Sequence, residues 1–446
     1  MTLTAGSAAA VITPPVGTAM EGYTARADVS QGVHDDLHAR ALVIDDGEGA
    51  VALVSCDLLG VDRRLVALAR SLASDATGLA PERILIAATH THAGPVGLGL
   101  GGEDALAQVT ARHIAGAVAA AYHARRPAVL KVGSTTVDSV SQNRRHPDWP
   151  IDPTLHVLLL DDPDPLQPPV AAAINFACHA TVLYHTNHLL SADYPGAAVR
   201  AVDKLFPGLD ALFFNGACGN VNPVWIEQEF VEAERVGAIV GAAAARLIAE
   251  LRPLGRGQRA DNIRWGERIE KPVTAGELVP DVRLRVARRQ VELPVKRFLP
   301  PEEYAATVSE LEARLEALGP SPDDEARRRL AEQLNRLRTE RQVAARMASL
   351  GQQTLHPELM AIGFAPGVAL LGLPGEFFVE TVAEIRAASG LRRLPVACYA
   401  NHYAGYIVPP AAFDEGGYEP GVTWLGPEAE GIVKAEALAL LREVGG

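Results

Sequence analysis

The sequence predicts an α/β fold in which a mixed, buried sheet is flanked by helices and interrupted late in the chain by an inserted helical hairpin. Short apolar runs alternate with longer stretches of helical periodicity, which is typical of strands that are covered by helices. With 446 residues, of which 48% are hydrophobic, the chain is long enough to bury one large core. We therefore expect a single domain over residues 1–446.

The predicted strands are short runs of aliphatic residues bounded by polar or turn-forming residues. They lie at 41–44, 51–55, 84–87, 129–133, 155–160, 172–175 and 212–215. Helical periodicity appears at 63–77, 106–125, 231–251 and 377–388. Charged residues interrupt the 231–251 stretch, and no apolar run reaches the roughly 20 residues that cross a bilayer, so no transmembrane segment is predicted.

Residues 301–350 differ in character from the rest of the chain. Apolar side chains recur there at three- and four-residue spacing in two successive blocks, which predicts a helical hairpin. Such a hairpin can be a solvated structural flap, a lid over a functional site or a dimer contact. These alternatives stay open at this point, and with them the oligomeric state.

Charge and cysteine content exclude several classes of protein. The net charge of -13 argues against nucleic-acid binding and against strong attraction to anionic membrane surfaces. The four cysteines have no regular spacing, so we expect reduced core residues rather than a disulfide framework. The first seven residues contain no basic residue and no apolar core of a signal peptide, which predicts a cytoplasmic protein.

Two histidines, His90 and His92, follow the predicted strand at 84–87. Residues i and i+2 of an extended segment point to the same side, so both imidazoles can face one cleft. A surface turn that happens to contain two histidines is the alternative.

Two further predicted strand ends also carry metal-binding side chains. His179 follows the apolar run at 170–174, and Glu376 follows a Pro-Gly turn at the predicted start of the 377–388 helix. Imidazole nitrogen and carboxylate oxygen are ligands of catalytic zinc, which keeps one position open for water. If these strand ends meet, the sequence predicts a zinc site.

Beyond these residues, the chain resembles the catalytic domain of the neutral, non-lysosomal ceramidases. The most recognisable motif is Thr89-His90-Thr91-His92, which continues through residue 95. Nine similar segments occur in the same order, at 11–17 with 21–23, 32–41, 89–95, 142–145, 178–181, 191–196, 215–223, 374–377 and 401–406.

The resemblance implies a mononuclear zinc ion with four protein ligands. Carried over position by position, the ligands are His90, His179, Glu376 and Tyr406. Residue chemistry alone would not select Tyr406, because a phenol with a reference pKa of about 10 is an uncommon zinc ligand and a buried structural tyrosine is the usual case.

The same resemblance assigns further roles around the metal. His92, Arg144 and Tyr418 match positions that share a proton or stabilise the reacting carbonyl, and Tyr23 and Asn143 match segments that we assign to substrate binding. Asn222, also assigned to substrate binding, stands where the ceramidases carry a serine. An amide cannot accept an acyl group, so a covalent serine route is excluded and ceramide itself becomes an open question as substrate.

A second departure concerns length. The ceramidases carry a C-terminal immunoglobulin-like domain, whereas this chain ends soon after Tyr418, so we expect a short member without that domain. The sequence therefore predicts a zinc-dependent hydrolase that uses activated water to cleave the amide bond of an acylated small molecule. A zinc-dependent esterase or lactonase and a non-catalytic metal-binding protein are the alternatives.

Overall fold

The computed structural model describes residues 2–23, 25–26, 28–96, 98, 104–254, 258–262, 267–271, 276–319, 325–351 and 353–445. Over these residues the predicted α/β fold is confirmed. The strands form several mixed sheets rather than one, because short strands far apart in the chain pair in separate groups.

The first large sheet contains the N-terminal strands. It consists of β1 (Thr4–Val11), β3 (His38–Asp45), β4 (Ala50–Cys56), β5 (Ile84–Ala88) and β6 (Arg126–Pro127). The order is β5-β4-β3-β1-β6, with β4 and β5 parallel and the other pairs antiparallel. Every residue of β4 and β5 is buried, which explains their unbroken apolar character.

The second large sheet is built in the same way. It consists of β7 (Val129–Thr136), β9 (Thr154–Asp161), β10 (Ala171–Phe176), β12 (Asp210–Asn215) and β16 (Gly276–Val279). The order is β12-β10-β9-β7-β16, and β10 and β12 are the parallel pair. Each large sheet therefore has two parallel strands at one edge.

A third sheet joins the two large ones in a common core. It contains β17 (Arg285–Gln290), β20 (Glu358–Ala365), β21 (Val368–Gly372) and β23 (Val396–Ala397). Leu53, Leu158 and Met360, one from each sheet, belong to the same buried cluster. The three sheets thus pack face to face in the interior.

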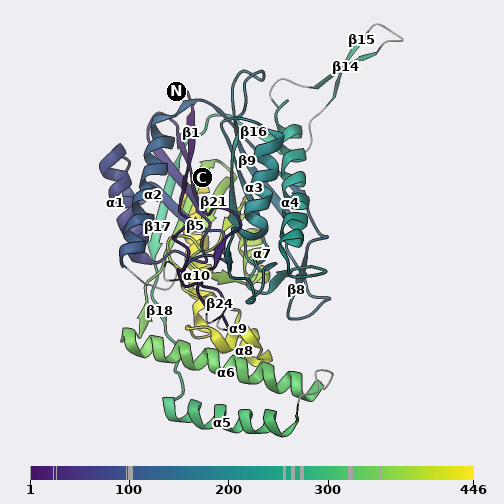
Figure 1. The fold of residues 1–446 in the computed structure, drawn as a ribbon. Coiled ribbons are helices and arrows are strands. Elements are labelled where there is room, and N and C mark those ends of the chain that lie inside the picture. Colours follow the sequence, from purple (N-terminus) through teal and green to yellow (C-terminus); the bar gives the residue numbers. More distant parts are fainter. Residues whose placement is uncertain are drawn as a thin grey trace.

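Helices cover the outer faces of these sheets (Figure 1). On one side lie α1 (Arg63–Thr77) and α2 (Asp104–His123), and on the other lie α3 (Asp193–Leu205) and α4 (Phe230–Leu251). The C-terminal helix α10 (Glu428–Gly445) packs on β20, beside α7 (Val379–Ser389).

Several short strands pair in separate two-stranded sheets. They are β2 (Gly32–Val33) with β11 (Leu189–Leu190), β8 (Ser141–Asn143) with β13 (Val221–Pro223), β14 (Gln258–Asn262) with β15 (Glu267–Lys271), and β18 (Leu293–Pro294) with β19 (Thr354–Leu355). A short 3-10 helix, Pro81–Arg83, precedes β5.

The helices predicted at 301–350 are α5 (Pro301–Ala317) and α6 (Glu325–Leu350), which pack against each other through a small cluster that includes Val308, Leu311, Leu330 and Leu334. They lie below the sheets in Figure 1, next to α8 (Pro410–Glu415) and α9 (Tyr418–Val422). No helix among the described residues combines the length and the apolar character needed to cross a membrane.

The helix expected at 377–388 begins later than predicted. It starts at Val379 with Phe378 as its N-cap, because Phe377 belongs to β22 (Glu376–Phe377). This strand pairs in parallel with β24 (Tyr406–Ile407), which places Glu376 opposite Tyr406. A long-range pairing thus places in a strand the residue at which local periodicity would begin the helix.

Candidate metal centre

The loops after β5 and β10 bring three histidines of the two large sheets together. His90 and His92 follow β5, His179 follows β10, and a parallel bridge between Thr91 and Ala180 holds the two loops side by side. One nitrogen of each imidazole lies within 4.8 Å of the others.

Glu376 completes this cluster from β22. Its Oε2 atom lies 3.1 Å from Nε2 of His179 and 3.4 Å from Nε2 of His90. All three side chains are buried, with 1–2% of the side chain exposed. The structure therefore brings together three of the four residues that the sequence suggested as metal ligands.

Backbone carbonyls orient the rings of His90 and His179. Nδ1 of His90 donates to the carbonyl of Leu59 at 2.7 Å, and Nδ1 of His179 donates to the carbonyl of Cys218 at 2.5 Å. A carbonyl can only accept, so each Nδ1 carries the proton and each Nε2 lone pair faces Glu376. Such an outer hydrogen bond is the usual support of a metal-binding histidine.

Two buried polar atoms at the centre of the cluster have no satisfactory partner. Nε2 of His179 and Oε2 of Glu376 make no well-formed hydrogen bond with the described residues. The other carboxylate oxygen, Oε1, accepts a hydrogen bond from the hydroxyl of Tyr403 at 2.5 Å. Unsatisfied buried polar atoms are costly, and a bound cation would satisfy both. The donor set, imidazole and carboxylate, fits zinc.

The protonation states fit the same interpretation. Burial, followed by the charge of Arg144, lowers the pKa of His179 to about 4, so this imidazole is neutral near pH 7. Burial opposes ionisation of Glu376, but His90 and His179 outweigh it and hold the pKa of the carboxyl well below its usual range. A neutral imidazole and an ionised carboxylate are the forms that bind metal.

His92 differs from the other two histidines. Its Nε2 lies 3.2 Å from Nε2 of His90, but its Nδ1 has no hydrogen-bond partner among the described residues. Its ring packs 4.9 Å from the ring of Tyr23. Burial, then His90 and His179, lowers the pKa of His92 well below its usual value. His92 therefore lacks the carbonyl support of a ligand and is poised, as a neutral base, beside one.

Tyr406 reaches the cluster through backbone pairing with Glu376. Its hydroxyl accepts a hydrogen bond from Nη2 of Arg144 at 3.0 Å. Burial raises the pKa of Tyr406 well above its ordinary value, although Arg144 acts in the opposite direction. Two residues are thus candidates for the fourth ligand: His92, which belongs to the group of three histidines, and Tyr406, which lies opposite Glu376.

A cavity of about 600 Å³ is lined in part by Arg144, the hydrogen-bond partner of Tyr406, and by Asn222 and Tyr418. Arg144 donates to Oε1 of Glu419 at 2.8 Å and to Oδ1 of Asn222 at 3.3 Å. Tyr418 is 46% exposed, and its hydroxyl makes no hydrogen bond with the described residues. Its hydroxyl is thus available to a bound molecule.

Comparison with known proteins gives the same family from sequence and from structure. The family model for the N-terminal part of neutral/alkaline non-lysosomal ceramidases matches residues 4–211. The neutral ceramidase of Pseudomonas aeruginosa is 24% identical over 461 residues, an alignment that covers 92% of this chain and 67% of that protein. The chain is therefore similar in sequence to the neutral/alkaline non-lysosomal ceramidases over most of its length.

Other relatives agree over shorter stretches. The neutral ceramidase of Drosophila melanogaster is 29% identical over 217 residues, covering 43% of this chain and 30% of that protein. The crystal structure of the Pseudomonas aeruginosa neutral ceramidase superposes with a TM-score of 0.72 at 22% identity, over 99% of this chain and 74% of that chain. This last likeness establishes a shared ceramidase fold.

Two residues that were assigned to substrate binding lie away from the cavity lining. Asn143 donates to the carbonyl of Pro150 at 3.0 Å and accepts from the backbone of Arg145 at 3.0 Å, so its amide supports a turn. Tyr23 donates to the carbonyl of Leu183 at 2.9 Å and packs against His92. In this chain both side chains support the walls of the site.

Sequence reasoning missed three residues of the candidate metal centre and its surroundings. Tyr403 bonds Glu376, Tyr399 stacks on His90 with ring centroids 4.0 Å apart, and Glu419 accepts from Arg144. Tyr403 lies inside the 401–406 segment, Tyr399 lies just before it and Glu419 follows Tyr418, but nothing local indicates which tyrosine faces the carboxylate.

Backbone strain also collects at this site. His90, Tyr399 and Asn401 have positive φ angles of 67°, 57° and 61°. Such conformations are uncommon for residues other than glycine and persist where the surroundings force them. His90 is thereby turned out of β5 and toward Glu376.

Proposed function

We propose that this chain hydrolyses an amide bond of an acylated small molecule with the help of one zinc ion. The zinc would be held by His90, His179, Glu376 and Tyr406. The observation that supports this most directly is the pair of buried, unsatisfied atoms, Nε2 of His179 and Oε2 of Glu376. Sequence similarity to the neutral ceramidases supports the reaction type.

Zinc bound there would polarise a carbonyl and lower the pKa of a coordinated water toward about 7. The surrounding residues of the chain then have distinct tasks. His92, neutral and 3.2 Å from His90, accepts the proton of the attacking water and can return it to the departing nitrogen.

Arg144 and Tyr418 stabilise the oxygen of the scissile carbonyl as it becomes negative. Arg144 is positioned by Glu419 and Tyr406, and the hydroxyl of Tyr418 is free of partners among the described residues. One well-placed donor of this kind lowers the barrier by about 3 kcal/mol. Asn222 lies at the edge of the cavity and positions Arg144.

The test combines metal analysis with a substrate panel. The purified chain should contain about one zinc per molecule, lose activity with a chelator and regain it with zinc. The panel compares an N-acyl amine, an N-acyl amino acid, a ceramide and an acyl ester. Cleavage of an amide supports the proposal. Zinc at full occupancy with cleavage of esters alone would establish an esterase instead.

A further inference from the structure

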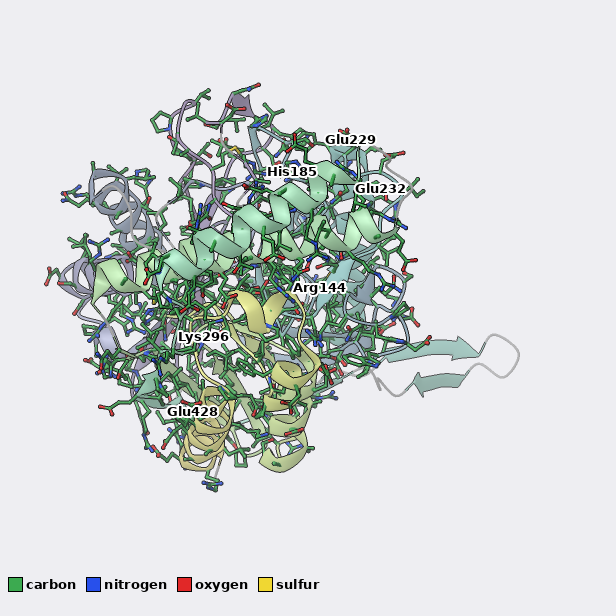
Figure 2. The ribbon with its side chains drawn as sticks, turned by 90° about the horizontal axis from the view of Figure 1, so that it is seen from below. Arg144, His185, Glu229, Glu232, Lys296 and Glu428 are labelled. Atoms are coloured by element: carbon green, nitrogen blue, oxygen red, sulfur yellow. The ribbon has the colours of Figure 1, made fainter. Side chains whose placement is uncertain are left out.

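A second cavity, of about 810 Å³, lies between α6 and the segment that carries Tyr418. Gly417 and Tyr418 line both this cavity and the smaller one beside Arg144, so the two cavities adjoin at these residues. Figure 1 shows α6 beneath α9, and Figure 2, seen from below, shows the hairpin helices crossing this face near Arg144. A cavity of this size accommodates part of a small-molecule ligand.

The residues that α6 contributes to this cavity are all polar or charged. Eight of its side chains line the cavity, namely Arg329, Glu332, Gln333, Asn335, Arg336, Arg338, Thr339 and Gln342. These side chains offer hydrogen bonds and charges that an alkyl chain cannot use. The part of a substrate that extends outward past Tyr418 is therefore expected to be polar.

Most positive charges around the two cavities are neutralised within the protein. Arg329 pairs with Glu325, and Arg338 with Glu312. On the other side of Tyr418, Arg144 and Arg145 share Glu419.

Arg336 is the exception on this wall. It has no hydrogen bond or ion pair with any described residue, although it is only partly exposed. Glu332, one helical turn earlier, is exposed and is not within ion-pairing distance of it. Arg336 therefore presents an uncompensated positive charge to the cavity.

Packing holds the stem of Arg336 against α9. A Cβ atom built on Gly421 would lie 2.8 Å from Cδ and 2.9 Å from Cγ of Arg336. This contact keeps the aliphatic part of the side chain against the helix that begins with Tyr418 and leaves the guanidinium at the cavity. The planar guanidinium matches a carboxylate in shape and charge.

We propose that α6 completes the substrate site and that Arg336 binds a carboxylate carried by the amide substrate. This inference rests on the proposed amide hydrolysis and narrows its substrate class to acidic amides. The carboxylate can belong to the amine part, as in an N-acyl amino acid, or to the acyl part, as in a dicarboxylic acid monoamide.

The experiment compares three amides of similar length with the zinc-loaded, full-length chain. They are N-decanoylglycine, the monodecylamide of succinic acid and the neutral N-propyldecanamide. The wild-type chain should have a lower KM for one of the two acids than for the neutral amide, and that acid identifies which side carries the carboxylate.

Arg336→Met keeps the stem that packs on Gly421 and removes the charge. The ratio of KM values between the preferred acid and the neutral amide should rise about tenfold, with kcat for the acid little changed. Arg336→Lys should recover part of the difference. Arg338→Met is the matched control, because Arg338 lines the same wall but is paired with Glu312. Glu332→Gln should shift the ratio in the opposite direction to Arg336→Met.

Two results would overturn the inference: no preference of the wild type for either acid, or an equal change for acid and neutral amide in Arg336→Met. If no amide is cleaved at all, the proposed function fails. Calorimetric binding of N-decanoylglycine to wild type and Arg336→Met then tests Arg336 separately, since binding needs no turnover. Equal affinities would remove Arg336 from the site.

Discussion

The inner cluster of His90, His179 and Glu376 contrasts with an outer pair of arginines, Arg144 and Arg145. Arg144 is linked to the inner cluster through Tyr406, which pairs with Glu376. In the inner cluster, oriented nitrogen and oxygen atoms face one another without satisfactory hydrogen bonds. Around the outer pair, Glu419 accepts from both arginines at 2.8 Å.

This difference indicates what each region is built to do. The inner cluster is incomplete without a positively charged ligand, whereas the outer pair is neutralised in advance by carboxylates. The inner cluster is therefore suited to bind a cation. The outer network, in which each charge has a partner, holds its side chains in position without a further ion. Removing an inner residue should therefore abolish metal binding, and removing an outer one should weaken turnover while the metal stays.

The largest effect is expected from His179→Ala. Loss of one of the ligands should empty the site and lower activity by about 10³-fold or more, because the water is no longer activated. Zinc content and amide turnover are measured together. His185→Ala is the control and should retain zinc, because His185 lies outside the group of three histidines and its ring meets that of Tyr184 edge-on. Full zinc occupancy in His179→Ala would remove His179 from the ligand set.

His92→Ala tests whether His92 is a zinc ligand or a base that accepts a proton. Because Nδ1 of His92 lacks the carbonyl support seen for His90 and His179, zinc should stay bound while kcat falls roughly 10²-fold. Elemental analysis of the variant decides the point. Loss of zinc would make His92 a ligand and would displace Tyr406 from that role.

Tyr403→Phe tests the support of Glu376. Removal of the 2.5 Å hydrogen bond to Oε1 should weaken zinc affinity by about 10- to 100-fold, as other outer hydrogen bonds do. A competition titration with a chelator measures the affinity. Tyr399→Phe is matched in size and burial, but its hydroxyl contacts Cys218 rather than Glu376, so its zinc affinity should stay close to wild type. Equal losses in both variants would contradict the assignment.

The smallest effect is expected at Asn222. Asn222→Ala removes one 3.3 Å hydrogen bond from Arg144, which keeps its bonds to Glu419 and Tyr406. We expect a cost of about 1 kcal/mol, or roughly a fivefold fall in kcat/KM, with zinc unchanged. Asn222→Ser should retain hydrolysis and mainly alter acyl preference. A variant that keeps zinc but cleaves none of the amides would make Asn222 a catalytic group.

Much of the inner cluster could be predicted from the sequence, because buried strands are recognisable as apolar runs and their ends are recognisable as breaks. His90, His92, His179 and Glu376 were all found in this way. The helix expected at Phe377 shows the limit, since a two-residue strand pairing with β24 is invisible to local periodicity. The cytoplasmic localisation stays a prediction.

By itself, the sequence determined the fold class, the two hairpin helices and the residues able to bind a metal, because these follow from apolar spacing and side-chain chemistry within short segments. Only the tertiary structure decided which atoms meet. The carboxylate of Glu419 lies 275 positions from Arg144, and Tyr403 lies 27 positions from Glu376, yet each pair is in direct contact. Likewise, the hairpin is recognisable from its own leucines, but its position against Gly421 is not. Local patterns encode the helices and strands, whereas the orientation of each side chain depends on how distant elements pack around it.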